Sequence, residues 1–414
     1  MDARTLLLIV INAAVASFCT VRWVYFYLLI IAKQKNLVDN PGSRKLQKLP
    51  IPNVGGIAVF FGIVSGVMIG SVMCGILDVE KNTTMLPVFA AMVMMLYVGA
   101  LDDTVGLSPW HRIFIEVIAV LSLIYASGNC IDTFHGLWGI DSFSWWLAVP
   151  LTVFVGVGII NSVNMIDGIN GLSSAMCMVV AILYGSFFVR SGDVTNAVLA
   201  FSAATSLFPF FIHNVFGSHS RMFIGDAGTM VMGLLMTWFT ISLLSSDVPM
   251  STYYDADVVN PIAYAIAVLC VPVFDVIRVF AMRILRGGSP FKPDRTHIHH
   301  IFLDVRASHI VITLIFLVAM LTVVLIWFVS TLLGASFEMQ LYIAIGSSML
   351  IVWGSYFFMS YGIKHNTKFV QKLAEFNDRH IRKRPLWWKR FSEWLDIPEA
   401  RLNERIERRN RKKQ

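Results

Sequence analysis

Charged residues are scarce in this sequence, and that scarcity excludes an ordinary soluble protein. Only 14% of the 414 residues are charged, whereas soluble domains carry about 25%. Hydrophobic residues make up 56% of the chain, and the mean hydropathy is +0.68. The composition therefore indicates an integral membrane protein.

Cysteines are also few, and their positions show no paired spacing. A disulfide framework and a thiolate metal site both need cysteines at regular intervals. Most of these five lie inside predicted helices, at Cys19, Cys74, Cys177 and Cys270, with Cys130 outside. We therefore expect neither kind of site.

Long apolar runs are what the sequence has instead. A helix needs about 20 apolar residues to cross a bilayer, and the first run lacks the cleavage site of a signal peptide. Eleven runs qualify, at 5–32, 54–77, 86–101, 113–127, 145–160, 172–189, 197–212, 228–245, 258–281, 308–333 and 341–361. The predicted fold is all-α and polytopic, with about 11 transmembrane helices.

Basic residues are rare in alternate loops, which predicts the orientation of the chain. Two bases and nine acids occupy the loops near 78–85, 128–144, 190–196, 246–257 and 334–340. The other loops hold most of the Lys and Arg, and an excess of these residues marks the cytoplasmic side. The N-terminus is therefore predicted to be periplasmic and the C-terminus cytoplasmic. All the polar motifs described below then lie on the cytoplasmic side, as a shared active site requires.

The net charge of +7 arises from the C-terminal tail. From Lys364 onward there are 16 Lys and Arg against 7 Asp and Glu. We divide the chain into a transmembrane catalytic domain, 1–362, and a basic cytoplasmic tail, 363–414. The tail is also rich in Trp, which favours an amphipathic helix on anionic membrane lipids over nucleic-acid binding. Removal of 380–414 is then expected to leave the chemistry intact.

Two adjacent acids, Asp102 and Asp103, end the third run. Neighbouring carboxylates repel each other unless a cation lies near them. A solvated helix end is the alternative explanation, but acids are otherwise rare in the cytoplasmic loops. The pair is therefore a candidate catalytic site.

The fifth run ends in the most specific pattern of the chain, 161–172, with the sequence NSVNMIDGINGL. Asn161, Asn164 and Asp167 recur every three residues and so share one helix face. The glycines of this segment permit a tight turn and close approach to a ligand. Asn170 could instead cap the next helix.

A single carboxylate, Asp226, stands between glycines at the start of the eighth run. Helix N-termini favour anions, so Asp226 could be a helix cap. It could equally be a ligand for a hard cation such as Mg²⁺.

A histidine cluster follows the ninth run, with Arg295, His297, His299 and His300 within six residues. A zinc site would need further nitrogen or sulfur ligands, whereas the neighbouring motifs offer the carboxylates and amides that suit Mg²⁺. We interpret the histidines and Arg295 as donors to phosphate oxygens, with a surface cluster as the alternative.

A basic loop separates the first two runs, and its Pro and Gly residues predict a defined structure. Either Lys45 or Lys48 is a candidate phosphate ligand. Two acids inside the runs are explained by neighbouring bases, as the structural pairs Arg112–Glu116 and Asp275–Arg278.

These motifs, in this order and spacing, resemble the polyprenyl-phosphate N-acetylhexosamine-1-phosphate transferases. The resemblance runs from about residue 35 to 310. The form of the histidine motif is similar to that of bacterial undecaprenyl-phosphate GlcNAc-1-phosphate transferases, whereas the peptidoglycan branch typically has three consecutive histidines. One departure is Asn170, where the family often has Asp.

The resemblance implies a magnesium-dependent enzyme of the bacterial inner membrane, with Mn²⁺ as an alternative metal. UDP-GlcNAc and undecaprenyl phosphate would give undecaprenyl-diphospho-GlcNAc and UMP, for O-antigen or enterobacterial common antigen synthesis. By motif, Asp226 would bind the metal with Asp167 beside it, and Asp102 or Asp103 would act at the lipid phosphate. The substrate-binding residues would be Lys45, Lys48, Asn161, Asn164, Asn170, Arg295, His297, His299 and His300. A homodimer is left open.

Two alternatives remain at the level of sequence. One is the same reaction with a different UDP-N-acetylhexosamine. The other is a membrane transporter, although transporter sites lie near the membrane midplane and often between inverted repeats. No convincing repeat is present here, and the polar motifs fall on one side.

Overall fold

The chain folds almost entirely into helices. The computed structural model describes residues 3–39, 50–79, 85–246, 259–289, 296–381 and 385–411. The long helices are α1 (Ala3–Gln34), α2 (Gly55–Ile76), α3 (Met85–Val105), α4 (Pro109–Ser127), α5 (Trp145–Met165), α6 (Leu172–Ser191), α7 (Val194–Phe216), α8 (Gly225–Leu244), α12 (His309–Leu332) and α16 (Leu386–Arg411). The shorter elements are β1 (Val38–Asp39), β2 (Ile51–Pro52), η1 (Leu137–Gly139), α9 (Pro261–Val268), α10 (Cys270–Leu285), α11 (Ile298–Asp304), α13 (Phe337–Ser348), η3 (Met349–Trp353), α14 (Gly354–Lys364), α15 (Lys368–Phe376) and η4 (Asn377–Ile381).

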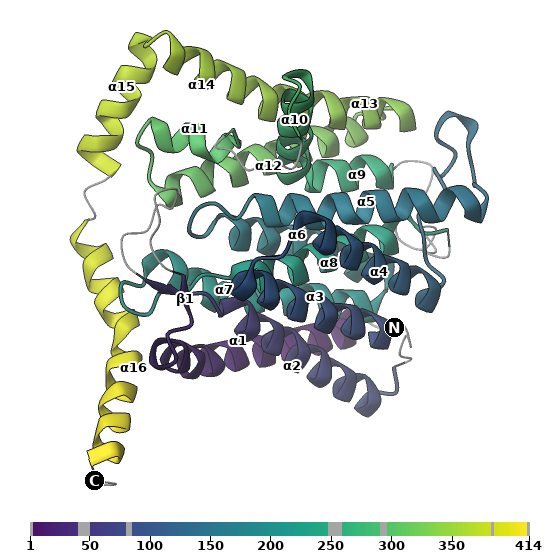
Figure 1. Cartoon of the computed structure of the whole chain (residues 1–414). Helices are drawn as coiled ribbons and strands as arrows, with labels where there is room; N and C mark the ends of the chain where they lie inside the picture. Colours follow the sequence, from purple (N-terminus) through teal and green to yellow (C-terminus); the bar gives the residue numbers. More distant parts are fainter. Residues whose placement is uncertain are drawn as a thin grey trace.

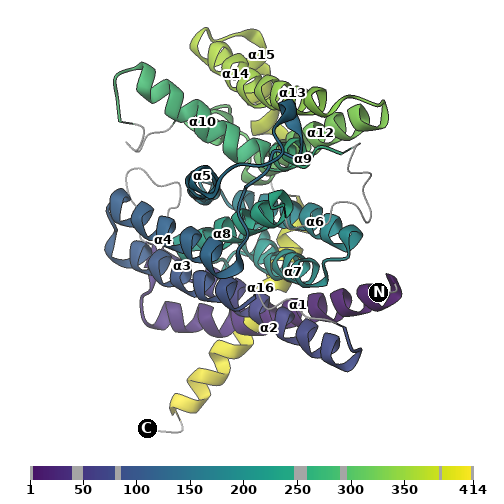
Figure 2. The same cartoon turned by 90° about the vertical axis from the view of Figure 1, so that its right-hand side faces the viewer.

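The helix content and length confirm the predicted multi-pass membrane fold. Within the described residues, ten helices are long and apolar enough to cross a membrane, or eleven if one bent pair forms a single span. These helices run side by side in Figure 1, and α5 lies between α8 and α10 (Figure 2). Several helices extend beyond the predicted apolar runs, because the polar motifs form their first or last turns.

The ninth predicted span is broken into α9 and α10, which meet at an angle of 76°. The cause is Pro272, in the first turn of α10. Proline lacks an N–H group, and its ring clashes with the carbonyl four residues earlier, which here belongs to Val268. A continuous helix is therefore interrupted at Leu269, the cap shared by both pieces.

Helix α8 is the central element of the bundle, and its apolar segment is completely enclosed by the neighbouring helices. Glycines on α2 and α3 allow this close packing. A Cβ atom at Gly56 would lie 2.4 Å from the Cα of Gly228, and one at Gly99 would lie 2.4 Å from the Cα of Ala227. The start of α8, where the candidate site lies, is thus held rigidly between two helices.

The segment between α1 and α2 is tied to the residues that precede α8. Strands β1 and β2 pair antiparallel. The N–H of Phe223 donates to the carbonyl of Pro52 at 2.8 Å, and that of Gly55 donates to the carbonyl of Phe223 at 2.9 Å. These bonds place Asn53 beside the N-terminus of α8.

The C-terminal tail forms a separate helical arm. In Figure 1, α15 and α16 run across the ends of the spanning helices rather than alongside them. Helix α16 packs against α7 and α1, with the rings of Trp388 and Phe391 at 4.4 and 5.4 Å from that of Phe216. The predicted tail is therefore docked on the transmembrane domain along one of its faces.

Candidate active site

The polar motifs meet in one cavity of about 640 Å³ at one end of the helix bundle. Its walls carry four carboxylates, from β1 (Asp39), the end of α3, the loop after α5 and the start of α8. The predicted residues that line it are Asp103, Asp167, Asn170, Asp226 and His300. Segments separated by more than a hundred residues are thus brought together, as a shared site requires.

Asp103 caps helix α8 from a neighbouring helix. Its Oδ1 accepts hydrogen bonds from the backbone N–H of Asp226 at 3.0 Å and from Asn53 Nδ2 at 2.7 Å, and its Oδ2 accepts one from the N–H of Ala227 at 3.2 Å. These N–H groups have no partner within their own helix, and the helix dipole favours an anion there. Asp103, rather than Asp226, is therefore the acidic cap of α8.

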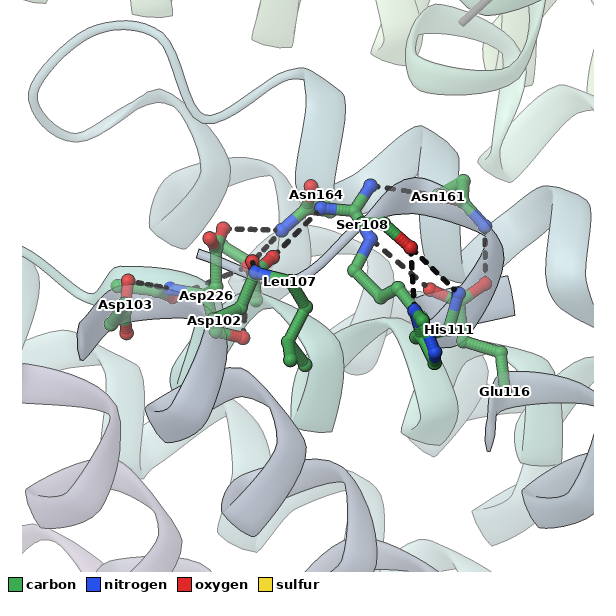
Figure 3. Close-up of polar contacts among 12 residues, drawn as sticks. Asp102, Asp103, Leu107, Ser108, His111, Glu116, Asn161, Asn164 and Asp226 are labelled. Atoms are coloured by element: carbon green, nitrogen blue, oxygen red, sulfur yellow. Dashed lines mark hydrogen bonds and ion pairs between the residues drawn. The ribbon is translucent and has the colours of Figure 1, made fainter. Parts of the chain in front are cut away.

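Asp226 lies in the first turn of α8 and points back toward α5. Its Oδ1 accepts a hydrogen bond from Asn164 Nδ2 at 2.7 Å, and the same amide group contacts Thr229 Oγ1 at 2.9 Å. The carboxyl of Asp102 is close enough to interact with that of Asp226. Figure 3 shows how these side chains converge from three helices.

Asp102 is engaged by its own loop and by α4. Its Oδ1 accepts the N–H of Leu107 at 2.6 Å, and its Oδ2 accepts Arg112 Nη1 at 3.1 Å. Arg112 also approaches Asn161 Oδ1 at 3.3 Å and Glu116 at 3.7 Å, and Asn161 Nδ2 donates to Glu116. The predicted pair of Arg112 with Glu116 is confirmed as part of a larger network. Figure 3 labels Asp102, Asn161 and Glu116 of this network. Neither Asp102 nor Asn161 lines the cavity.

Asp167 follows the end of α5 and is buried at the wall of the cavity. Its Oδ1 accepts a hydrogen bond from Ser173 Oγ at 2.5 Å. Burial, together with the nearby charges of Asp226 and Asp103, raises the pKa of the Asp167 carboxyl to about 7. The mutually repelling carboxylates Asp103, Asp167 and Asp226 therefore form an environment that a bound cation would stabilise.

The histidine segment is fixed to α10 by a buried ionic network. Asp275 Oδ2 is 2.9 Å from His297 Nδ1, and its Oδ1 accepts the N–H of Ile298 at 3.2 Å and Arg278 Nη2 at 2.5 Å. Arg278 also donates to the carbonyl of Thr296 at 2.8 Å. The predicted Asp275–Arg278 pair is confirmed, and its function is to anchor the residues that lead into α11.

His299 packs against the glycine turn that follows Asp167. It is only 1% exposed, and within the described residues neither ring nitrogen has a hydrogen-bond partner. A Cβ atom at Gly168 would lie 2.1 Å from its Nε2. Burial, together with the neighbouring His300 and His297, lowers the pKa of His299 to about 3. His299 is therefore neutral at pH 7.

The contact between Gly168 and His299 predicts a loss of activity in Gly168→Ala. The added methyl group would displace the imidazole or the turn that carries Asp167. Because displacements of about 1 Å in an active site can cost about 10²-fold in rate, we expect a decrease of that order in turnover. Gly158→Ala is the control, because a Cβ atom there meets nothing within 4 Å. Equal activity of the two variants would contradict the expectation.

The pKa of His299 predicts a pH-dependent stability. Unfolded histidine binds a proton near pH 6.5, whereas folded His299 resists protonation down to about pH 3. Its contribution to stability is therefore complete above pH 6.5 and is lost as the pH falls through this window. The midpoint of thermal unfolding, measured from pH 7.5 to 5, should fall less steeply in His299→Gln than in the wild type. Parallel curves would refute this origin of the pH dependence.

Several residues that the sequence did not single out also belong to the cavity wall. The N–H of Asn170 donates to His309 Nδ1 at 3.2 Å, and His309 lines the cavity. Asn170 does not cap α6, since Gly171 is the cap residue there. Asn53 lines the wall too, and its position immediately before Val54-Gly55-Gly56 was the available signal. The predicted ligands Lys45, Lys48 and Arg295 lie outside the described residues and stay predictions.

The donor atoms of the cavity fit a hard divalent cation. No group of three His, Cys, Asp or Glu side chains in the described part of the chain is already arranged around a metal position. However, Asp167 and Asp226 offer carboxylate oxygens, and the buried Asn53 Oδ1 has no hydrogen-bond partner within the described residues. Oxygen ligands of this kind suit Mg²⁺ or Mn²⁺ better than zinc.

Comparison with known proteins agrees with this geometry. The model of glycosyl transferase family 4 matches residues 85–244, which include all four aspartates of the predicted site. Over this segment, the chain is similar to glycosyl transferase family 4. This match and the names of the relatives below indicate a phosphotransferase enzyme, so the transporter alternative is set aside.

Curated relatives align with this protein over most of both chains. An undecaprenyl-phosphate alpha-N-acetylglucosaminyl 1-phosphate transferase of Yersinia pestis is 28% identical over 69% of this chain and 75% of its own length. The protein of the same name from Salmonella typhi is 29% identical over 69% and 75%. A decaprenyl-phosphate N-acetylglucosaminephosphotransferase of Mycolicibacterium smegmatis is 27% identical over 74% and 77%.

Proposed function

We propose that this enzyme transfers N-acetylglucosamine 1-phosphate from UDP-GlcNAc to undecaprenyl phosphate, with release of UMP. The observation that carries the proposal is the convergence of Asp103, Asp167, Asp226 and His300 on one cavity at the end of the membrane spans. A lipid phosphate can reach such a site from the bilayer, and a nucleotide sugar can reach it from water. The names of the relatives support the same pair of substrate classes.

The chemistry is the displacement of UMP at phosphorus. An oxygen of the lipid phosphate attacks the phosphorus that carries the sugar, and the bond from that phosphorus to the UMP oxygen breaks. A phosphate monoester has its second pKa near about 6, so the attacking group is already ionised at pH 7. Positioning and neutralisation of charge therefore matter more than a strong base.

The contacts of the aspartates suggest a different role for each of them in the proposed reaction. We assign Asp226 and Asp167 as ligands of Mg²⁺ or Mn²⁺, which would neutralise diphosphate charge when bound. Asp103 already accepts three hydrogen bonds from α8 and Asn53. It therefore suits the orientation of Asp226 better than the removal of a proton. Asp102 supports this arrangement through Arg112.

The histidines and the basic loop complete the proposed site. We assign His300, which faces the cavity, to the diphosphate oxygens, with His299 and His297 behind it. Lys45, Lys48 and Arg295 stay proposed phosphate ligands, and Asn161, Asn164 and Asn170 stay proposed contributors to substrate binding. The site is proposed to face the cytoplasm, with the product used for cell-envelope polysaccharide synthesis.

The decisive experiment is an assay of the purified protein with undecaprenyl phosphate, Mg²⁺ and a panel of UDP-sugars. We expect release of UMP with UDP-GlcNAc and formation of the lipid-linked diphospho sugar. Release with another UDP-N-acetylhexosamine alone would correct the sugar and keep the reaction. No release with any sugar, from protein that is monodisperse and folded, would reject the proposal.

We also propose that α16 lies on the membrane surface. Its side chains Trp387 and Trp394 are each 59% exposed on the face that does not dock on the protein. Tryptophan is favoured at membrane–water interfaces, and the tail is strongly basic. Anionic lipids are therefore the expected partners of this exposed face.

A further inference from the structure

The cavity is lined by basic residues as well as by acidic ones. Lys33, from the last turn of α1, lines it together with His219 and Arg221, from the loop between α7 and α8. None of these three residues was predicted from the sequence, and the aspartate chemistry described above does not use them. Cationic side chains and hydrogen-bond donors at the wall of a phosphate-transfer site suit an anionic part of a substrate.

The loop that carries His219 and Arg221 is held by the C-terminal helix. Asp396, on α16, accepts hydrogen bonds from three consecutive backbone N–H groups, those of Ser218 at 3.3 Å, His219 at 3.1 Å and Ser220 at 3.0 Å. Its Oδ1 also accepts Ser220 Oγ at 2.6 Å. One carboxylate thus fixes the backbone of the whole turn, because unpaired N–H groups would otherwise face the helix.

A second acid of α16 fixes the lysine. Glu399 is only 4% exposed and forms an ion pair with Lys33. Lys33 Nζ also donates to the carbonyl of His219 at 2.7 Å, so that the lysine and the turn are joined directly. On the other side of the turn, Arg221 Nη2 donates to the carbonyl of Gly217 at 2.9 Å.

We propose that α16 is a built-in part of the substrate site. Asp396 and Glu399 are positioning residues that hold Lys33, His219 and Arg221 as a subsite for a phosphate group of a substrate. The proposal rests on the proposed transfer reaction for the identity of that substrate. The phosphate belongs either to the nucleotide sugar or to the polyprenyl phosphate, and both present the same anionic oxygens. It replaces the expectation that removal of 380–414 leaves the chemistry intact.

The test compares Asp396→Asn with Glu393→Gln, a matched change of an exposed acid on the same helix. Steady-state transfer is measured in the full-length protein while each substrate is varied in turn. Because hydrogen bonds to charged groups are strong, we expect the KM of one substrate to rise about tenfold in Asp396→Asn, with kcat nearly unchanged. The substrate whose KM rises is the source of the phosphate. The proposal is overturned if both KM values equal those of Glu393→Gln.

A binding measurement separates this proposal from the proposed reaction. Equilibrium dialysis with inorganic diphosphate needs no turnover, so it remains informative if the wild type transfers none of the sugars tested. We expect binding to be about tenfold weaker in both Asp396→Asn and Arg221→Gln than in the wild type. If Asp396→Asn does not fold, diphosphate binding by Arg221→Gln still tests the subsite. Undiminished diphosphate binding in folded Arg221→Gln would reject the subsite.

Discussion

Asp226→Asn should abolish transfer while the protein still folds and enters the membrane. Asparagine keeps an oxygen that can accept the hydrogen bond from Asn164, which is 2.7 Å long in the wild type, so the packing of α8 is preserved. What is lost is the negative charge in a cavity assigned to a divalent cation. Loss of a metal ligand or of a comparable electrostatic contact costs several kcal/mol, so turnover should fall on the order of 10³-fold.

The measurement is UMP release at saturating Mg²⁺ and saturating substrates. Asp78→Asn is the control, because Asp78 is an exposed acid after α2 with a φ of 53° that asparagine tolerates. Thermal unfolding of both variants should resemble that of the wild type. Wild-type turnover in Asp226→Asn would show that the metal assignment is wrong, whatever the nature of the substrate.

Asp275→Leu should have the largest effect on stability. The change would leave Arg278, which is 1% exposed, as a buried charge without its carboxylate. Breaking a buried ion pair on one side costs about 3–5 kcal/mol. The variant would also release His297 and the N–H of Ile298, which Asp275 holds. We therefore expect a strongly lowered unfolding midpoint and loss of transfer.

The double variant Asp275→Leu with Arg278→Met distinguishes stability from positioning. Replacing both members of a buried pair by apolar residues is often neutral or stabilising, so the unfolding midpoint should largely recover. Transfer should stay low, because the histidine segment has lost its anchor on α10. Recovery of both properties would mean that the pair serves stability alone. If Asp275→Leu alone were as stable as the wild type, the pair would have no role in stability.

Some features of the site could be predicted because they depend on local order along the chain. Asn161 and Asn164 do lie one turn apart at the end of α5, and Asn164 binds Asp226. Asp167, however, lies beyond Met165, the last residue of α5, so its predicted place on the same helix face was wrong. Two alternatives that the sequence left open needed distances between segments. Asp226 could have been the cap of α8, but Asp103 performs that role from 123 residues earlier in the chain. Asn170 could have been a cap, but its N–H instead contacts His309.

The sequence by itself determined the membrane fold, since the number and length of apolar runs depend only on hydrophobicity and the thickness of a bilayer. It also grouped the polar motifs at one end, because they recur at the ends of alternate runs. Only the tertiary structure decided which carboxylates share the cavity and that Pro272 breaks the ninth span. It alone showed that two acids in a basic tail contact residues of the candidate site: Asp396 bonds to the turn at Ser220, and Glu399 pairs with Lys33. The physical reason is the distance along the sequence over which each interaction acts. Burial and helix periodicity act between neighbours in sequence, whereas hydrogen bonds between distant segments depend on how the helices pack.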